Sequence, residues 1–198
     1  MINRREFLEV AAVSALPAIA GARQRVDDRL GASRPALPTV LIDARHAQAR
    51  TVGARLTVAG ALVRAIPEGD VTQVWLEHIG PAWRRQPLIV AGLTARPALF
   101  CLEQFALGCG LRVVFHGEHV VHRQGRTEHR LLRGADTAGV SGRDLELAGP
   151  LWPARIAEAI ATHAGKAGSE RFGPSDAALS PTLPAGAQLL TSWIIAAA

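Results

Sequence analysis

From residue 39 onward, short apolar runs alternate with segments in which apolar residues recur every three or four positions. The runs have the length of buried strands, and the spaced segments have the 3.6-residue period of helices that bury one face. Four of the runs predict strands, at residues 39–43, 61–66, 88–92 and 111–115. A helical segment follows each of the first three, so the pattern is strand, helix, strand, repeated along the chain.

The first two helices are predicted from their apolar spacing and their end residues. Apolar side chains repeat at helical intervals over residues 49–59, and Gly60 stands where this helix would end. The second helix has an apolar stripe over residues 71–79. Asp70 and Gln73 precede and open it with the spacing of a capping box, in which each side chain accepts a free amide at the helix start.

Gly80-Pro81 should break or kink that second helix, because proline lacks the amide that the helical ladder needs. A third helix is predicted over residues 95–107, with Thr94 as its N-terminal cap. The remainder of the chain predicts a hairpin, a helix with proline in its first turn and a last strand. These elements are expected at residues 119–123 with 127–132, 153–163 and 188–196, and loops at 135–150 and 165–186.

Alternating strands and helices connected by right-handed crossovers form a parallel sheet with helices on both faces. The hairpin and the last strand favour a mixed sheet over a purely parallel one. We therefore predict a three-layer, Rossmann-like α/β fold over residues 39–198. A chain of 198 residues, 48% hydrophobic and 20% charged, is sufficient for one such core and does not have the composition of a disordered protein.

The N-terminus has a different pattern. Arg4 and Arg5 are followed after one residue by Phe7 and Leu8, and an uncharged apolar run occupies residues 10–22. This segment resembles the signal peptides of the twin-arginine export pathway. The run is short for a membrane-spanning helix and ends in small residues of the kind found at cleavage sites.

The resemblance implies a signal peptide at residues 1–22, cleaved after Ala20 or Ala22, and a linker at 23–38. It implies export of the folded chain to the periplasm by the twin-arginine machinery, with membrane contact through this segment alone. An uncleaved segment serving as a membrane anchor is a further, less favoured reading. Proteins that use this route often acquire a cofactor or a subunit first, so the module is expected to act in the periplasm on its own or as the partner of a larger redox or hydrolytic protein.

The net charge of +5 comes from 22 basic and 17 acidic residues, and every basic residue except Lys166 is arginine. A positive balance favours anionic partners. Nucleic acid is not the favoured partner, because no stretch combines dense basic residues with interleaved aromatic ones. A small anionic ligand remains compatible with this charge.

Ligands of open α/β sheets bind beyond the carboxyl ends of the strands. The polar residues that follow the first, third and fourth predicted strands are therefore the candidate ligand-binding residues: Asp43, Arg45, His46, Thr94, Arg96, His116 and Glu118. The helix start at Thr94 is suited to an anionic group, because its amides are unpaired. Alternatively, Asp43 and Thr94 are helix caps, and the arginines are solvated surface residues.

His116, His119, His122 and His129 make the densest titratable cluster. A metal centre needs imidazoles that converge on one point. On a regular strand His116 and His122 share one face while His119 points to the other, so a shared site would require a bulge at Gly117. Ordinary histidines on a partly exposed hairpin are the favoured interpretation.

The sequence contains no phosphate-binding loop, no dinucleotide fingerprint and no complete catalytic motif. We therefore expect an exported binding or accessory module, and no residue pattern names its cofactor. The alternative is a small hydrolase or metal-assisted enzyme. In that case His116 or His46 is the base, Asp43 or Glu118 orients it, and the helix start at Thr94 stabilises negative charge.

Overall fold

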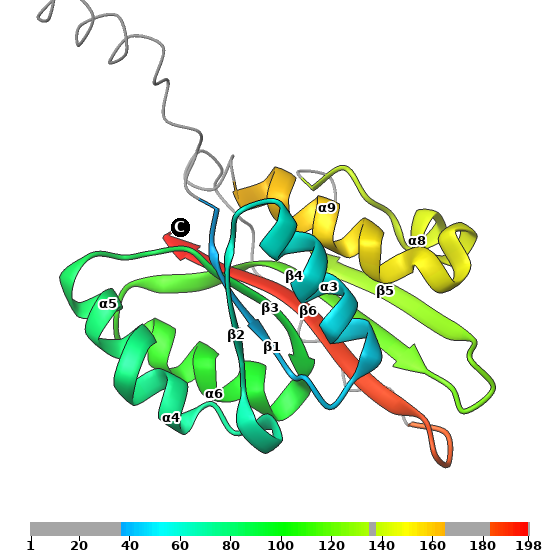
Figure 1. The fold of residues 1–198 in the computed structure, drawn as a ribbon, viewed down its shortest axis with the longest axis horizontal. Helices are drawn as coiled ribbons and strands as arrows, with labels where there is room; N and C mark the ends of the chain where they lie inside the picture. Colours follow the sequence, from blue (N-terminus) through cyan, green and yellow to red (C-terminus); the bar gives the residue numbers. More distant parts are fainter. Residues whose placement is uncertain (1–36, 135–137, 165–182, 198) are drawn as a thin grey trace, which may run out of the picture. The chain divides into compact units, whose positions relative to one another are not determined.

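Six strands lie side by side in the order β2-β1-β3-β6-β4-β5 (Figure 1). A computed structural model describes residues 37–134, 138–164 and 183–197, which all belong to one compact unit. The strands are β1 (Thr39–Ile42), β2 (Leu62–Ala65), β3 (Val90–Ala95), β4 (Leu111–Val121), β5 (Thr127–Arg133) and β6 (Gln188–Ala197). The predicted signal segment with Arg4, Arg5, Phe7 and Leu8 lies outside the described residues.

The sheet is mixed. Strand β1 pairs in parallel with β2 and β3, and β6 runs antiparallel between β3 and β4. Strand β5 is antiparallel to β4 and forms one edge. Strands β1, β2, β3 and β4 therefore point the same way, and their carboxyl ends lie along one edge of the sheet.

Helices cover both faces of the sheet, as the alternating pattern predicts (Figure 1). One face packs against α3 (Ala47–Val58), α8 (Gly142–Ala148) and α9 (Trp152–Ala164). The other packs against α6 (Arg96–Leu107) and a continuous helical stretch made of α4 (Thr72–Val74), η2 (Trp75–Ile79) and α5 (Gly80–Arg85). Short 3-10 turns η1 (Pro67–Gly69) and η3 (Gly149–Leu151) complete the described elements. In the described part of the chain, no helix combines the length and apolar character needed to cross a membrane.

Two apolar cores fill the spaces between the layers, because successive side chains of each strand point to opposite faces. On β6, Trp193 faces α6 and Ile194 faces α9, and both are fully buried. Gly92 on β3 lets the indole lie across the sheet, since a Cβ there would come within 2.6 Å of Trp193 Cζ2. The Trp193 Nε1–H donates to Thr94 Oγ1 at 3.0 Å, which connects this core to the end of β3.

The hairpin prediction is wrong at its first arm. The predicted strand at 111–115 and the arm at 119–123 are one strand, β4, which runs through His116 and Gly117. Register shifts between Val113 and Phe115, and between His116 and Gly117, let this strand pair with β6 on one side and β5 on the other. Such bulges interrupt the regular alternation that sequence patterns depend on.

Gly80-Pro81 does not break the helix. Residues 75–79 form a π-helical turn, and α5 continues from Gly80 with Pro81 in its first turn, where a missing amide is tolerated. The predicted capping box is also wrong. Asp70 accepts from the backbone N–H of Thr72 at 2.8 Å and from its hydroxyl at 2.6 Å, while Gln73 donates to Glu77.

The predicted loop at 135–150 contains a helix in its described part. Helix α8 begins after Ser141, whose hydroxyl accepts from the amide of Asp144, and the Asp144 carboxylate accepts from the amide of Ser141. This reciprocal capping box is visible in the sequence as Ser-x-x-Asp. The loop prediction for residues 135–150 is therefore wrong over residues 142–148.

Candidate functional site

Four buried polar residues form one row across the sheet near the carboxyl ends of the parallel strands. The backbone N–H of Asp43 continues the pairing of β1 with β3. Thr94 on β3 is opposite Thr191 on β6, and Thr191 is in turn opposite Glu118 on β4. Each is at most 2% exposed. Asp43 follows β1 and Thr94 lies near the end of β3, as predicted for the carboxyl ends of these strands. His116 and Glu118, predicted to follow a strand that ends at residue 115, instead lie within β4, and Thr191 is the member of the row that the sequence argument missed.

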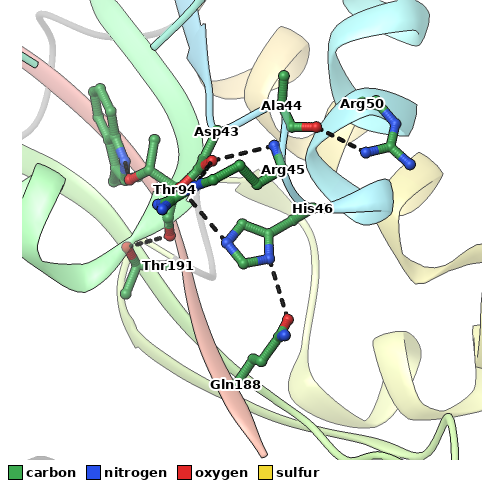
Figure 2. Close-up of polar contacts among 9 residues, drawn as sticks. Asp43, Ala44, Arg45, His46, Arg50, Thr94, Gln188 and Thr191 are labelled. Carbon is green, nitrogen blue, oxygen red and sulfur yellow. Dashed lines mark hydrogen bonds and ion pairs between the residues drawn. The ribbon is translucent and has the colours of Figure 1, made fainter. Parts of the chain in front are cut away.

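At one end of the row, Asp43 is bound by Arg45 (Figure 2). The Arg45 Nε donates to Oδ1 at 2.9 Å and Nη2 donates to Oδ2 at 2.7 Å, and the backbone N–H of Arg45 donates to Oδ1 as well. These bonds lower the pKa of Asp43, although its burial acts in the opposite direction. Gly69 makes the arrangement possible, since a Cβ there would collide with the Arg45 guanidinium.

His46 is fixed from two sides. Its Nε2 lies 3.5 Å from Asp43 Oδ2, and its Nδ1 lies 3.1 Å from Oε1 of Gln188 at the start of β6 (Figure 2). Its side chain is 15% exposed. The sequence-predicted trio Asp43, Arg45 and His46 is therefore a single contact cluster, and Gln188 is a partner that the sequence analysis did not identify.

Thr94 is not the cap of α6. It lies within β3, its hydroxyl accepts from Trp193, and its carbonyl accepts from the Thr191 hydroxyl at 3.1 Å. Pairing with β6 extends β3 to Ala95, which occupies the cap position without a side-chain bond. Because Thr94 is fully buried, its hydroxyl is not presented to a ligand.

At the other end of the row, Glu118 lies between two arginines. Its Oε1 accepts from Arg96 Nη1 at 3.1 Å, and its Oε2 is 3.1 Å from Arg130 Nη2 in an ion pair that lacks hydrogen-bond alignment. The glutamate side chain is 2% exposed, whereas those of Arg96 and Arg130 are 41% and 47% exposed. A buried carboxylate thus positions two guanidinium groups that still reach solvent.

His116 lies next to this trio and lines a groove of about 410 Å³ between α6 and β4. Burial, together with the smaller effect of the positive charges of Arg96, Arg133 and Arg130, lowers the pKa of His116 to about 4. Its buried Nε2 finds no hydrogen-bond partner among the described residues. The imidazole is therefore neutral near pH 7.

The structure separates His116 from Asp43. Strands β3 and β6 lie between β1 and β4, so three strand spacings of ~4.8 Å put their backbones ~14 Å apart. This exceeds hydrogen-bond reach. The predicted site residues therefore divide into a cluster around Asp43 and a cluster around Glu118 and His116. A histidine base in one cluster cannot be oriented by a carboxylate in the other.

His119 and His129 are not the ordinary surface histidines that were predicted. His119 is fully buried, with Nδ1 2.8 Å from His129 Nδ1 and Nε2 2.8 Å from Ser192 Oγ, and its ring stacks on Trp152. Burial lowers the pKa of both imidazoles, that of His129 to about 4. Trp152 from α9 covers this part of the hairpin, which local sequence patterns do not reveal.

The predicted separation of faces agrees with the structure. His116 lies on the α6 face and His119 on the α9 face, despite the bulge at Gly117. His122 lies 3.1 Å from Glu128. Within residues 37–134, 138–164 and 183–197, no three potential ligand side chains are grouped to hold a metal ion.

No protein-family model matches this chain, and neither a curated protein nor a solved structure does. Its function is therefore argued from the site itself.

Proposed function

We propose that this protein is an exported binding module that holds a small anionic molecule between Arg96 and Arg130. The observation that carries the proposal is the placement of Glu118, a buried carboxylate within β4 that fixes two half-exposed guanidinium groups. Arginines fixed in this way lose less side-chain entropy when they bind a ligand. The site belongs to the polar row that passes near the carboxyl ends of β1 and β3, and ligands of α/β folds bind on this side of the sheet.

The chemistry of the trio favours an anion. Each guanidinium has five N–H donors in a planar fork, and Glu118 engages one nitrogen of each. The remaining donors match the oxygens of a carboxylate or phosphate. Two arginines and one glutamate also leave a net charge of +1 before a ligand binds.

Binding is favoured over catalysis because the polar row lacks a free nucleophile. The hydroxyls of Thr94 and Thr191 are buried and bonded to neighbouring strand atoms or side chains. Asp43 is engaged through both carboxylate oxygens by Arg45. The hydroxyl groups of the row are therefore committed to the fold, and contact with a ligand falls to the exposed guanidinium groups of Arg96 and Arg130.

A hydrolase remains the second candidate, because the Asp43 carboxylate lies 3.5 Å from Nε2 of His46, as a carboxylate that orients a general base would. In this reading Nδ1 must leave Gln188 to accept a proton. The hydrolase candidate predicts turnover of a simple ester such as p-nitrophenyl acetate that is abolished in His46→Ala. The binding proposal predicts no turnover above the His46→Ala background and an anion affinity that this variant leaves unchanged.

The binding proposal is tested by calorimetric titration of phosphate and of succinate. Replacing Arg96 or Arg130 with glutamine should weaken the affinity about tenfold each, the worth of a charge-assisted hydrogen bond. Arg130→Lys keeps the positive charge beside Glu118. A loss of affinity in this variant therefore reports lost recognition of the anion and not lost stability of the fold. The matched control is Arg155→Gln, which removes an arginine paired with Glu158 on the α9 face. Equal affinity in all variants, or no anion binding, would contradict the proposal.

Export is tested on the protein itself. We expect protein recovered from the periplasmic fraction to begin at Gly21 or Arg23, and replacement of Arg4 and Arg5 by lysine to retain the chain in the cytoplasm. N-terminal sequencing of both fractions provides the measurement. An exported chain that still begins at Met1 would show that the segment is not removed.

A further inference from the structure

We infer that the anionic molecule carries an aliphatic chain, which lies in the groove between α6 and β4 while its charged head contacts the arginines around Glu118. This inference rests on the proposed function and specifies its ligand class as an amphiphilic carboxylate. Three features of the described residues carry it: the lining of the groove, its continuity with the arginine pair, and its charge.

Apolar side chains make up part of the groove lining, beside the polar residues Glu103, Gln104, Arg112, His116 and Arg133. Leu111 and Val113 contribute from β4, and Ala106 and Leu107 from the last turn of α6. Leu107 is 63% exposed although it lies beside the groove. Its exposed side chain is available to cover a bound aliphatic chain, and removing that area from water favours binding.

The groove and the arginine pair are continuous along β4 and β5. His116 and Glu118 both lie on the α6 side of β4, because His116 lines the groove with α6 residues and Glu118 binds Arg96, the first residue of α6. On β5, Arg133 is opposite His116 and Arg130 is opposite Glu118. A head group at Glu118 and a chain extending past His116 toward Leu111 would therefore follow one strand direction.

The charge of this surface selects the sign of the head group. Arg96, Arg112, Arg130 and Arg133 face Glu103 and Glu118, four arginines against two glutamates, a net charge of +2. Arg133 is fixed by donating to the Val113 carbonyl at 2.8 Å. The low pKa of His116 agrees with this positive field, because Arg96, Arg133 and Arg130 all act on it.

The test is a calorimetric series of straight-chain carboxylates from acetate to decanoate with the full chain at pH 7.5. We expect affinity to rise about two- to threefold for each added methylene, somewhat less than for complete burial because the groove is open to solvent. Octyltrimethylammonium, with the same chain and the opposite charge, should not bind. Leu107→Ser should lower the affinity for octanoate about fivefold and leave that for acetate unchanged.

Leu147→Ser is the matched control, because Leu147 is an exposed leucine on α8, 77% exposed and away from the groove. Anion binding with no dependence on chain length, or equal effects of the two leucine variants, would overturn the inference and leave the proposed function standing. Failure of every carboxylate in the series to bind would overturn the inference, and failure of phosphate and succinate as well would overturn the proposed function. Sedimentation with phosphatidylglycerol vesicles that is lost in Leu107→Ser would overturn the inference in favour of a lipid surface.

Discussion

Replacing Gly92 with alanine should lower the free energy of unfolding by about 3 kcal/mol or more, the range of severe overpacking in a protein core. A Cβ at this position would lie 2.5 Å from the Leu41 carbonyl oxygen and 2.6 Å from Trp193 Cζ2. The carbonyl belongs to the neighbouring strand, so relief requires β1 and β3 to separate. Urea unfolding followed by tryptophan fluorescence measures the change.

Gly108→Ala is the matched control, since Gly108 has an ordinary φ of −66° and its added Cβ would meet nothing closer than 3.6 Å. We expect this variant to unfold within about 0.5 kcal/mol of the parent chain. Trp193→Phe should not rescue Gly92→Ala, because the clash with the Leu41 carbonyl remains. A stable Gly92→Ala variant would mean that β1 and β3 do not pair as described.

Lowering the pH from 7 to 5 should destabilise the fold, with His116 alone costing about 2 kcal/mol. The pKa of His116 is about 4 in the folded chain, against 6.5 for an unperturbed histidine. Between these values the unfolded chain binds a proton that the folded chain does not, so stability falls as the pH falls. His119 and His129, whose pKa values are also lowered by burial, act in the same direction.

Urea unfolding at pH 7 and pH 5 measures this dependence. His116→Gln should reduce the loss of stability between the two pH values by roughly 2 kcal/mol. The control is His78→Gln, because the His78 side chain is 37% exposed, and this variant should keep the full dependence. The lowered pKa of Asp43 contributes only below about pH 4, outside this interval. Equal stability at the two pH values would contradict the neutral, buried state of these histidines.

The periodicity of apolar residues was sufficient to predict the layers. Runs such as residues 39–43 and stripes such as 49–59 are local, and their burial follows from period alone. The position of β6 was not predictable in this way. It inserts between β3 and β4 from about 100 residues further along the chain, and this insertion is what extends β3 through Thr94 and makes the cap prediction wrong.

The expectation that ligands bind beyond the carboxyl ends of the strands identified Asp43, Arg96 and Glu118 but missed Arg130. A tight turn at Gln124-Gly125 would place Glu118 opposite Leu131. The observed pairing of Val121 with Thr127 shifts the register by one residue and places Glu118 opposite Arg130. A shift of one residue exchanges the two faces of a strand. The position of Arg130 beside Glu118 therefore depends on turn geometry that the sequence did not specify.

The most direct test of the central claim, that Glu118 positions Arg96 and Arg130 for an anion, is an NMR spectrum of the arginine Nε–Hε groups during titration with octanoate. We predict that the Arg96 and Arg130 signals shift together and saturate at one ligand per chain, while the Arg155 signal stays in place. Unmoved Arg96 and Arg130 signals, or equal shifts of all arginines, would contradict the account.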